Sequence, residues 1–191
     1  SVVDISPDDA PRRCFYINGA SDVVLDGLVL KTGTKFLSSS SGGLSILAEN
    51  MGARNYVQHC KFDGNTTAYT QSLQGGTLYF SGEEVTLRDC SFGNSSGGSG
   101  SLVYLECTKP SGLFDCDFSK NSLYYGGTLL EAAESDAPLY LESCSFDCVY
   151  TESQAVLLKC PATLKSCLFT RCATGANGQG AYLYISQCNH V

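Results

Sequence analysis

The sequence predicts an all-β chain folded as a right-handed parallel β-helix, a solenoid with about six to seven coils of about 27 residues each. Three observations lead to this prediction. A Cys-x-Phe motif recurs at intervals close to that length, and a second series of short apolar strands alternates with it. No segment keeps the 3.6-residue period of an amphipathic helix.

The Cys-x-Phe motif marks one strand of each predicted coil. It occurs at Cys60/Phe62, Cys90/Phe92, Cys116/Phe118, Cys144/Phe146 and Cys167/Phe169, with Phe-to-Phe spacings of 30, 26, 28 and 23 residues. An aliphatic residue stands five positions before each Phe, at Val57, Leu87, Leu113, Leu141 and Leu164. Near the N-terminus, Leu25, Leu28 and Leu30 occupy the same three slots. These repeated positions predict three interior columns, and the mainly polar residues between them predict a solvated outer face.

A second strand lies between successive motifs, and each example follows a loop rich in Gly, Ser, Asn or Thr. The six examples are 42–47, 75–80, 100–105, 126–131, 154–159 and 180–185. Strands that recur without intervening helices suit a parallel solenoid, whose crossovers are right-handed almost without exception. Equivalent residues in neighbouring coils would then lie about 4.8 Å apart, the strand-pairing distance.

Length and charge limit the organisation and the partners. Residues 1–191 suit a single β-helix domain. We expect it to be a segment of a longer chain, because the last strand would otherwise expose its edge and core side chains. The formal net charge is -7 and the basic residues are scattered, which disfavours nucleic acid and anionic membranes. No apolar run reaches the roughly 18 residues of a transmembrane helix.

Eleven cysteines indicate an oxidising compartment, so we expect an extracellular or cell-surface location. Two sequons, at Asn65 and Asn94, are candidate N-glycosylation sites in a eukaryotic secretory pathway. Cysteines of the Cys-x-Phe motifs are expected to be buried and mostly reduced. Their stacked Cβ atoms would lie slightly beyond the 3.5–4.5 Å that a disulfide prefers.

One disulfide is expected, between Cys148 and Cys172. Both follow a motif Phe by two or three residues and fall in the loops of neighbouring coils, where the backbone adjusts readily to bridging geometry. Cys107 and Cys160 are expected not to bridge, because a whole coil around Glu131 lies between them.

Two segments resemble paired motifs of a known family. Residues 62–65 read Phe-Asp-Gly-Asn and residues 118–121 read Phe-Ser-Lys-Asn, and glycine pairs follow at 75–76 and 126–127. Over roughly residues 42–185 this pattern resembles the FxxN and GGA[I/L/V] repeats of chlamydial polymorphic outer membrane proteins and similar protist surface proteins. Several coils depart from it, since Phe146 and Phe169 lack the Asn. The resemblance implies a β-helical surface or passenger segment, often adhesive, and leaves its ligand open.

The alternative function is a carbohydrate-active β-helix enzyme, such as a polysaccharide lyase or glycoside hydrolase. Glycan hydrolysis needs two carboxylates about 5 to 9 Å apart in one groove. The nearest candidates, Asp115, Asp117, Glu142 and Asp147, sit singly beside Cys-x-Phe motifs and are interpreted as solvated outer residues. We therefore expect no enzyme and no catalytic residue. No C-x-x-C knuckle, His pair or nucleotide-binding glycine pattern occurs, so neither a metal nor another cofactor is expected.

The strands that follow the glycine pairs are predicted to form a lateral interface. The third residues after the second glycine are Ile46, Tyr79, Val103, Leu130, Leu157 and Leu183. Their neighbours are also largely apolar, and only one face of a strand can fill the interior. We expect this flank to pack against another protein chain or a further segment of the parent chain, unless long loops of the same chain cover it. The expected function is thus a non-enzymatic scaffold in adhesion or a larger surface assembly, with carbohydrate or a host surface as a further partner class.

Overall fold

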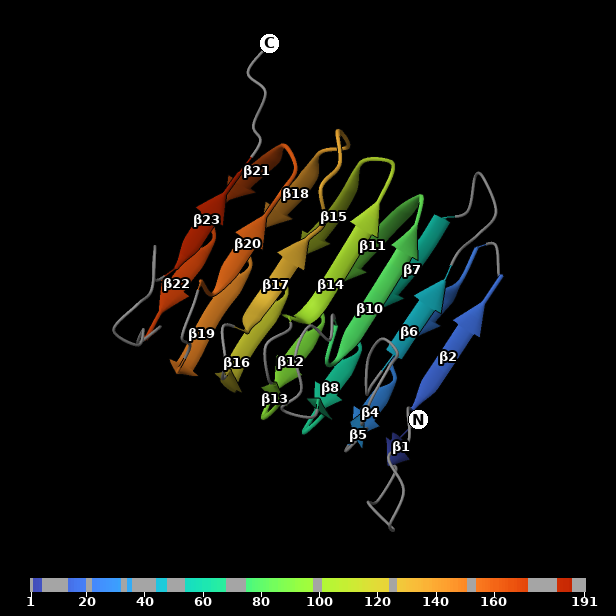
Figure 1. Cartoon of the computed structure of the whole chain (residues 1–191). Coiled ribbons are helices and arrows are strands. Elements are labelled where there is room, and N and C mark those ends of the chain that lie inside the picture. The colour runs from blue at the N-terminus through green and yellow to red at the C-terminus, as the bar shows by residue number, and fades with distance from the viewer. Residues whose placement is uncertain are drawn as a thin grey trace.

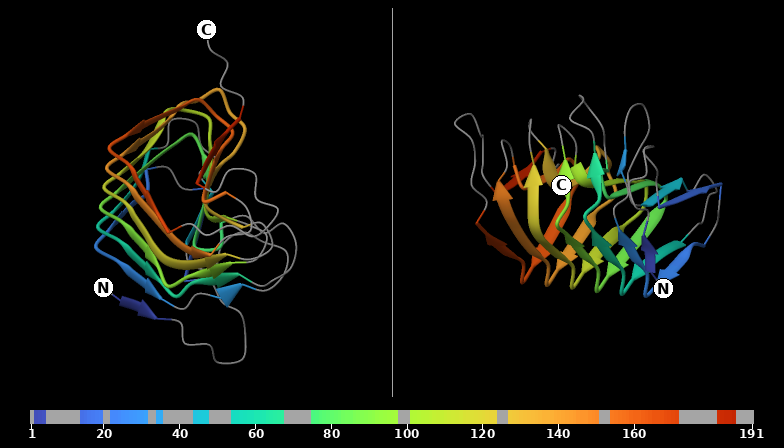
Figure 2. Two further views of the ribbon diagram at one scale, coloured as in Figure 1. Left: turned by 90° about the vertical axis from the view of Figure 1, so that its left-hand side faces the viewer. Right: turned by 90° about the horizontal axis from the view of Figure 1, so that it is seen from below.

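The computed structural model describes residues 2–4, 14–19, 22–31, 34–35, 44–47, 54–67, 75–97, 101–123, 127–150, 154–171 and 182–186. These residues form three parallel sheets that run side by side along one axis (Figures 1 and 2). We name them by their place in Figure 1: the front sheet faces the viewer, the rear sheet lies behind it, and the lower sheet closes the coil beneath both.

The front sheet contains seven strands, β2 (Phe15–Asn18), β6 (Leu44–Leu47), β10 (Leu78–Gly82), β14 (Ser101–Cys107), β17 (Thr128–Ala132), β20 (Val156–Leu158) and β23 (Leu183–Ile185). The rear sheet contains six strands, β3 (Val24–Asp26), β7 (Arg54–Gln58), β11 (Glu84–Arg88), β15 (Ser111–Phe114), β18 (Leu139–Glu142) and β21 (Ala162–Lys165). The lower sheet contains ten strands, β1 (Val2–Asp4), β4 (Val29–Lys31), β5 (Thr34–Lys35), β8 (Lys61–Asp63), β9 (Thr66–Thr67), β12 (Ser91–Gly93), β13 (Ser96–Gly97), β16 (Asp117–Leu123), β19 (Ser145–Tyr150) and β22 (Leu168–Thr170).

The chain visits the sheets in the same order in every coil, from front to rear to lower. Neighbouring strands pair in parallel, as in β10 with β14 and β11 with β15. Seen from the end that carries β22 and β23, the coils turn anticlockwise as they approach the viewer, so the solenoid is right-handed (Figure 2). The predicted fold class is therefore confirmed. Among the described residues there is no helix capable of crossing a bilayer.

The predicted interior columns are also confirmed. In the lower sheet Phe62, Phe92, Phe118 and Phe146 are fully buried, and Leu30 pairs in register with Phe62 at the head of the column. Successive rings from Phe62 to Phe169 stack with centroids 4.7 to 5.0 Å apart. This distance matches the spacing of paired strands, so each coil adds one ring to a continuous stack.

The motif cysteines form a second column, at the corner between the rear and lower sheets. Cys60, Cys90, Cys116 and Cys144 are buried free thiols, and Cys167 is half-buried. Each thiol donates to two backbone carbonyls, one in its own coil and one in the coil before, over 3.2 to 3.7 Å. The cysteine therefore fills the corner and helps to satisfy the backbone there.

A tight turn precedes each motif cysteine. The residue directly before it has a positive φ in every coil: His59, Asp89, Asp115, Ser143 and Ser166, with φ between 49° and 56°. Gly27, with a φ of 65°, occupies this turn in the first coil. Asp and His adopt this left-handed conformation more often than most side chains. The turn directs their side chains outward, and His59, Asp89 and Asp115 are exposed.

The Asn of the FxxN segments ties adjacent coils together from inside. Asn121 Nδ2 donates to the Phe92 carbonyl over 2.9 Å, and its Oδ1 accepts from the Ser95 backbone N–H over 3.0 Å. Asn65 Nδ2 donates to the Leu30 carbonyl over 3.2 Å. Both Asn side chains are fully buried. Ser95 takes the same place in the coil between them, which explains why that coil lacks the motif.

Candidate functional site

Four carboxylates are candidate catalytic groups, and each contacts a side chain of a neighbouring coil. Glu142 accepts from Lys165 over 2.5 Å, and Asp147 forms an ion pair with Arg171, which lowers the pKa of Asp147. Asp115 lies 3.5 Å from Arg88. Asp117 accepts from Ser119 and from Ser145. These carboxylates thus lie on the outer surface, and each is paired with a side chain of a neighbouring coil.

His59 lies between two carboxylates of neighbouring coils at the exposed corner. Its Nδ1 is 2.7 Å from Asp26 in the coil before, and its Nε2 is 3.7 Å from Asp89 in the coil after. The hydrogen bond to Asp26 raises the pKa of His59 and lowers the pKa of Asp26. Within the described residues no group of three or more His, Cys, Asp and Glu side chains is arranged to hold a metal ion.

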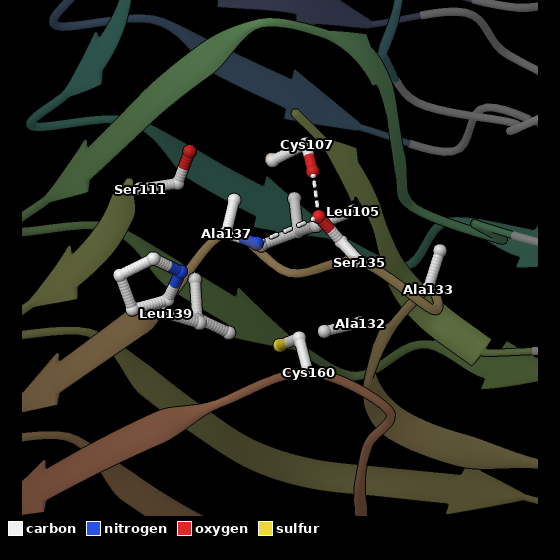
Figure 3. Close-up of a pocket in the computed structure, with 10 residues that line it drawn as sticks. Leu105, Cys107, Ser111, Ala132, Ala133, Ser135, Ala137, Leu139 and Cys160 are labelled. Carbon is white, nitrogen blue, oxygen red and sulfur yellow. Dashed lines mark hydrogen bonds between the residues drawn. The ribbon is translucent and has the colours of Figure 1, made fainter. Parts of the chain in front are cut away.

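A small hollow lies under the corner 133–138, which connects β17 of the front sheet to β18 of the rear sheet (Figure 3). Ser135 Oγ donates to the Cys107 carbonyl over 2.7 Å and accepts from the Ala137 N–H over 3.0 Å, which ties the corner down. The hollow measures about 220 Å³ with its open mouth, and its enclosed part holds about one water molecule. It is therefore too small for a sugar or nucleotide substrate.

Two cysteines, Cys107 and Cys160, lie on opposite sides of this hollow (Figure 3), and neither is in a disulfide. Their coils are separated by two strand spacings, about 9.6 Å, whereas a disulfide requires Cα atoms within about 7 Å. Burial raises the pKa of Cys107 to about 12, so its thiol is protonated and unreactive at neutral pH.

The predicted lateral-interface residues do not share one face of the front sheet. Ile46, Val103 and Leu130 are fully buried in the core, and Leu183 packs against it. Only Tyr79 and Leu157 occupy an outward column. That column runs through Tyr16, Ser45, Tyr79, Tyr104, Glu131, Leu157 and Tyr184. The interface prediction is thus wrong for the buried residues. The glycine pairs stand at unequal distances from the strands that follow them, and a difference of one residue in that distance moves a side chain from one face of the sheet to the other.

The outward face of the front sheet is also less apolar than predicted. Glu131 interrupts the outward column and forms an ion pair with Lys159 over 2.8 Å. Tyr79 and Tyr104 stack with ring centroids 5.5 Å apart, and Tyr104 is buried. Leu102 and Leu129, which alternate with the core residues, are fully buried within the chain as well. No continuous apolar stripe therefore follows this column.

The two sequons differ in accessibility. Asn65 is fully buried with its amide nitrogen bonded to the backbone, so the folded chain cannot carry a glycan there and this candidate is wrong. Asn94 is exposed and its Nδ2 donates to Asp63 over 2.6 Å. For the expected disulfide, Cys172 and the side chain of Cys148 lie outside the described residues. The eight cysteines whose side chains are described are in no disulfide.

Aromatic side chains on the rear sheet form a surface that the Cys-x-Phe pattern did not single out. Tyr56 and Tyr140 are 37 % and 42 % exposed and occupy one outward column, with Thr86 and Gly112 between them. Alternation about the buried Val57 and Leu141 is the sequence signal that could have placed these tyrosines outside.

Phe114 lies over Gly112 in this surface. A Cβ on Gly112 would come within 2.6 Å of the Phe114 ring, so only glycine allows the ring to lie there. The Arg88 guanidinium stacks 4.7 Å from the centre of the same ring. We call these four side chains, Tyr56, Arg88, Phe114 and Tyr140, the rear aromatic surface.

No protein-family model, curated protein or solved structure matches this chain. The fold, and the side chains that it brings to the surface, are therefore what indicates the function.

Proposed function

We propose that the chain is a non-enzymatic β-helical scaffold that acts outside the cell or on its surface, in adhesion or as a structural unit of a larger assembly. One observation supports this proposal most: ionisable side chains on the outer surface form ion pairs between one coil and the next. Arg171 pairs with Asp147, Lys165 with Glu142, and Lys109 with Glu83 over 2.6 Å. Such inter-coil contacts, added to three continuous sheets, suit a rigid rod that presents its flanks to partners.

The cysteine arrangement is compatible with the proposed extracellular location. The four most buried motif thiols are at most 2 % exposed and donate to backbone carbonyls, so the fold shields them from oxidants and from disulfide exchange. A cysteine-rich chain can thus persist with free interior thiols in an oxidising compartment. The FxxN resemblance to surface proteins points to the same location.

A turnover assay tests the non-enzymatic part of this proposal. The purified chain would be incubated with neutral and anionic polysaccharides, and new reducing ends and unsaturated sugar products would be measured. We expect no product above that formed with heat-denatured chain. The matched variants are Asp117→Asn and Glu142→Gln, which remove the charge of outer carboxylates without removing their volume. Product formation that disappears in either variant would establish the enzyme instead.

A further inference from the structure

We propose that the rear aromatic surface binds an uncharged oligosaccharide. This proposal rests on the scaffold function proposed above and adds a ligand class for one flank of the scaffold. Tyr56 and Tyr140 are three coil steps apart in one column, about 14 Å. Between them Thr86 is short, and the ring of Phe114 covers Gly112. A linear ligand laid along the strands therefore has a tyrosine on either side.

The floor between the tyrosines offers stacking and hydrogen bonds together. Phe114 lies over Gly112, and the Arg88 guanidinium stacks on its ring while lying 3.5 Å from Asp115. Planar groups of this kind match the flat C–H faces of a sugar ring, and the guanidinium and tyrosine hydroxyls match its hydroxyl groups. Tyrosine combines an apolar body with a polar tip, which suits a ligand of mixed character.

The charged side chains of this flank favour an uncharged ligand. The rear-sheet strands carry three basic and three acidic side chains: Arg54, Arg88, Lys165, Asp26, Glu84 and Glu142. These strand residues balance, and Lys165 and Glu142 neutralise one another directly. The exposed Asp89 and Asp115, at the ends of β11 and β15, add negative charge, and Asp115 lies beside Arg88. The flank therefore repels a polyanion, and its cations Arg88 and Lys165 already have acidic partners, which leaves little charge for a charged protein partner.

The pattern of exposure argues against a second copy of this chain as the occupant. The two tyrosines are separated by Thr86 and by the Arg88–Phe114 stack, so their apolar areas do not merge into one patch. Protein interfaces concentrate their energy in a contiguous, desolvated centre. Two separate tyrosines with polar groups between them better suit a chain of sugar rings that lies between the two.

Titration calorimetry on the whole chain tests this proposal. The probes are the neutral hexasaccharides cellohexaose, chitohexaose, mannohexaose and xylohexaose, with hexagalacturonate as the anionic comparison. We expect at least one neutral probe to bind, and Tyr140→Ala to weaken it about tenfold, the effect of losing one aromatic contact. Tyr56→Ala with Tyr140→Ala should abolish binding.

Tyr184→Ala is the matched control, because Tyr184 is 43 % exposed but lies on the front sheet, and it should keep wild-type affinity. Equal melting temperatures would verify that each variant is folded. Binding to no neutral probe, binding to hexagalacturonate alone, equal loss in Tyr184→Ala, or self-association that Tyr140→Ala abolishes would each overturn the assignment. Shortening of a hexasaccharide during the titration would instead refute the scaffold function, so the two failures are distinguishable.

Discussion

The rings of Phe92 and Phe118 stack with their centroids 4.7 Å apart and their planes inclined by 15°. Both side chains are fully buried, and the stack continues to Phe62 on one side and to Phe146 on the other. The interior of the lower sheet is therefore a single column in which each ring contacts the coil before and the coil after it. Its stability should depend most on the rings in the middle.

Replacing the central ring tests this column. Phe118→Leu should lower the free energy of unfolding by about 1–2 kcal/mol, because it removes two stacking contacts and part of the buried volume. Leu is tolerated, since Leu30 occupies the same column. Urea denaturation measures the loss. Phe169→Leu is the control, because Phe169 is half-buried, and an equal loss there would contradict the column account.

The Asn of the FxxN segment is predicted to be structural. Asn121→Ala should cost about 2–3 kcal/mol, because it leaves the Phe92 carbonyl and the Ser95 N–H without their side-chain partner inside the core. Asn18→Ala, at an exposed strand position, should change the stability by less than about 0.5 kcal/mol. Denaturant titrations of both variants check this, and similar losses would show that the burial of Asn121 is unimportant.

Glycosylation should be confined to one sequon. When the chain is secreted from a eukaryotic host, mass spectrometry should find a glycan on Asn94 and none on Asn65, because only Asn94 is exposed. Asn94→Gln should secrete an unmodified chain. A glycan on Asn65 of protein that still melts cooperatively would mean that residues 62–66 do not pack as described.

His59 should make stability depend on pH. Its pKa is raised above 6.5 by the hydrogen bond to Asp26, so its contribution is complete below pH 6.5 and disappears as the pH rises through the folded value. The pKa of Asp26 is lowered below 3.8, so the contribution of Asp26 is complete above that pH and is lost as the pH falls through the folded value. The pair therefore stabilises the fold most between about pH 4 and 6.5.

An NMR titration of the imidazole checks the His59 prediction. Asp26→Asn should bring the pKa of His59 back towards 6.5, and His59→Gln should remove the decline in stability above pH 6.5. His190→Gln is the control and should leave that decline in place. An unshifted His59 in the unmodified chain would disprove the pairing.

Much of the fold could be predicted because the column residues repeat in register. Phe62 and Phe118 define the lower sheet from sequence alone, and Leu30 extends it to the first coil as expected, as Leu25 does for the rear sheet. The front sheet was harder, because its loops differ in length. Counting from glycines therefore assigned the buried Val103 to the outside.

The surfaces were less predictable than the core. Alternation around Val57 indicates that Tyr56 faces outward, but nothing local shows that the Phe114 ring lies over Gly112 or that Arg88 stacks upon it. Phe114 and Gly112 lie in the same strand, and their contact depends on the side-chain conformation of Phe114. The Arg88–Phe114 contact joins two coils and depends on the register between β11 and β15. The burial of Asn65 follows from the same cause, since its partner is the carbonyl of Leu30 in the preceding coil.

Labelling of intact cells tests the surface-scaffold account most directly. Cells of the source organism would be treated with a membrane-impermeant amine reagent, and the chain and its culture medium would be examined by mass spectrometry. If the chain is a surface scaffold, exposed lysines such as Lys61, Lys120 and Lys165 become modified on intact cells, or the chain is recovered from the medium. A chain that is absent from the medium and becomes labelled only after the cells are lysed would contradict it.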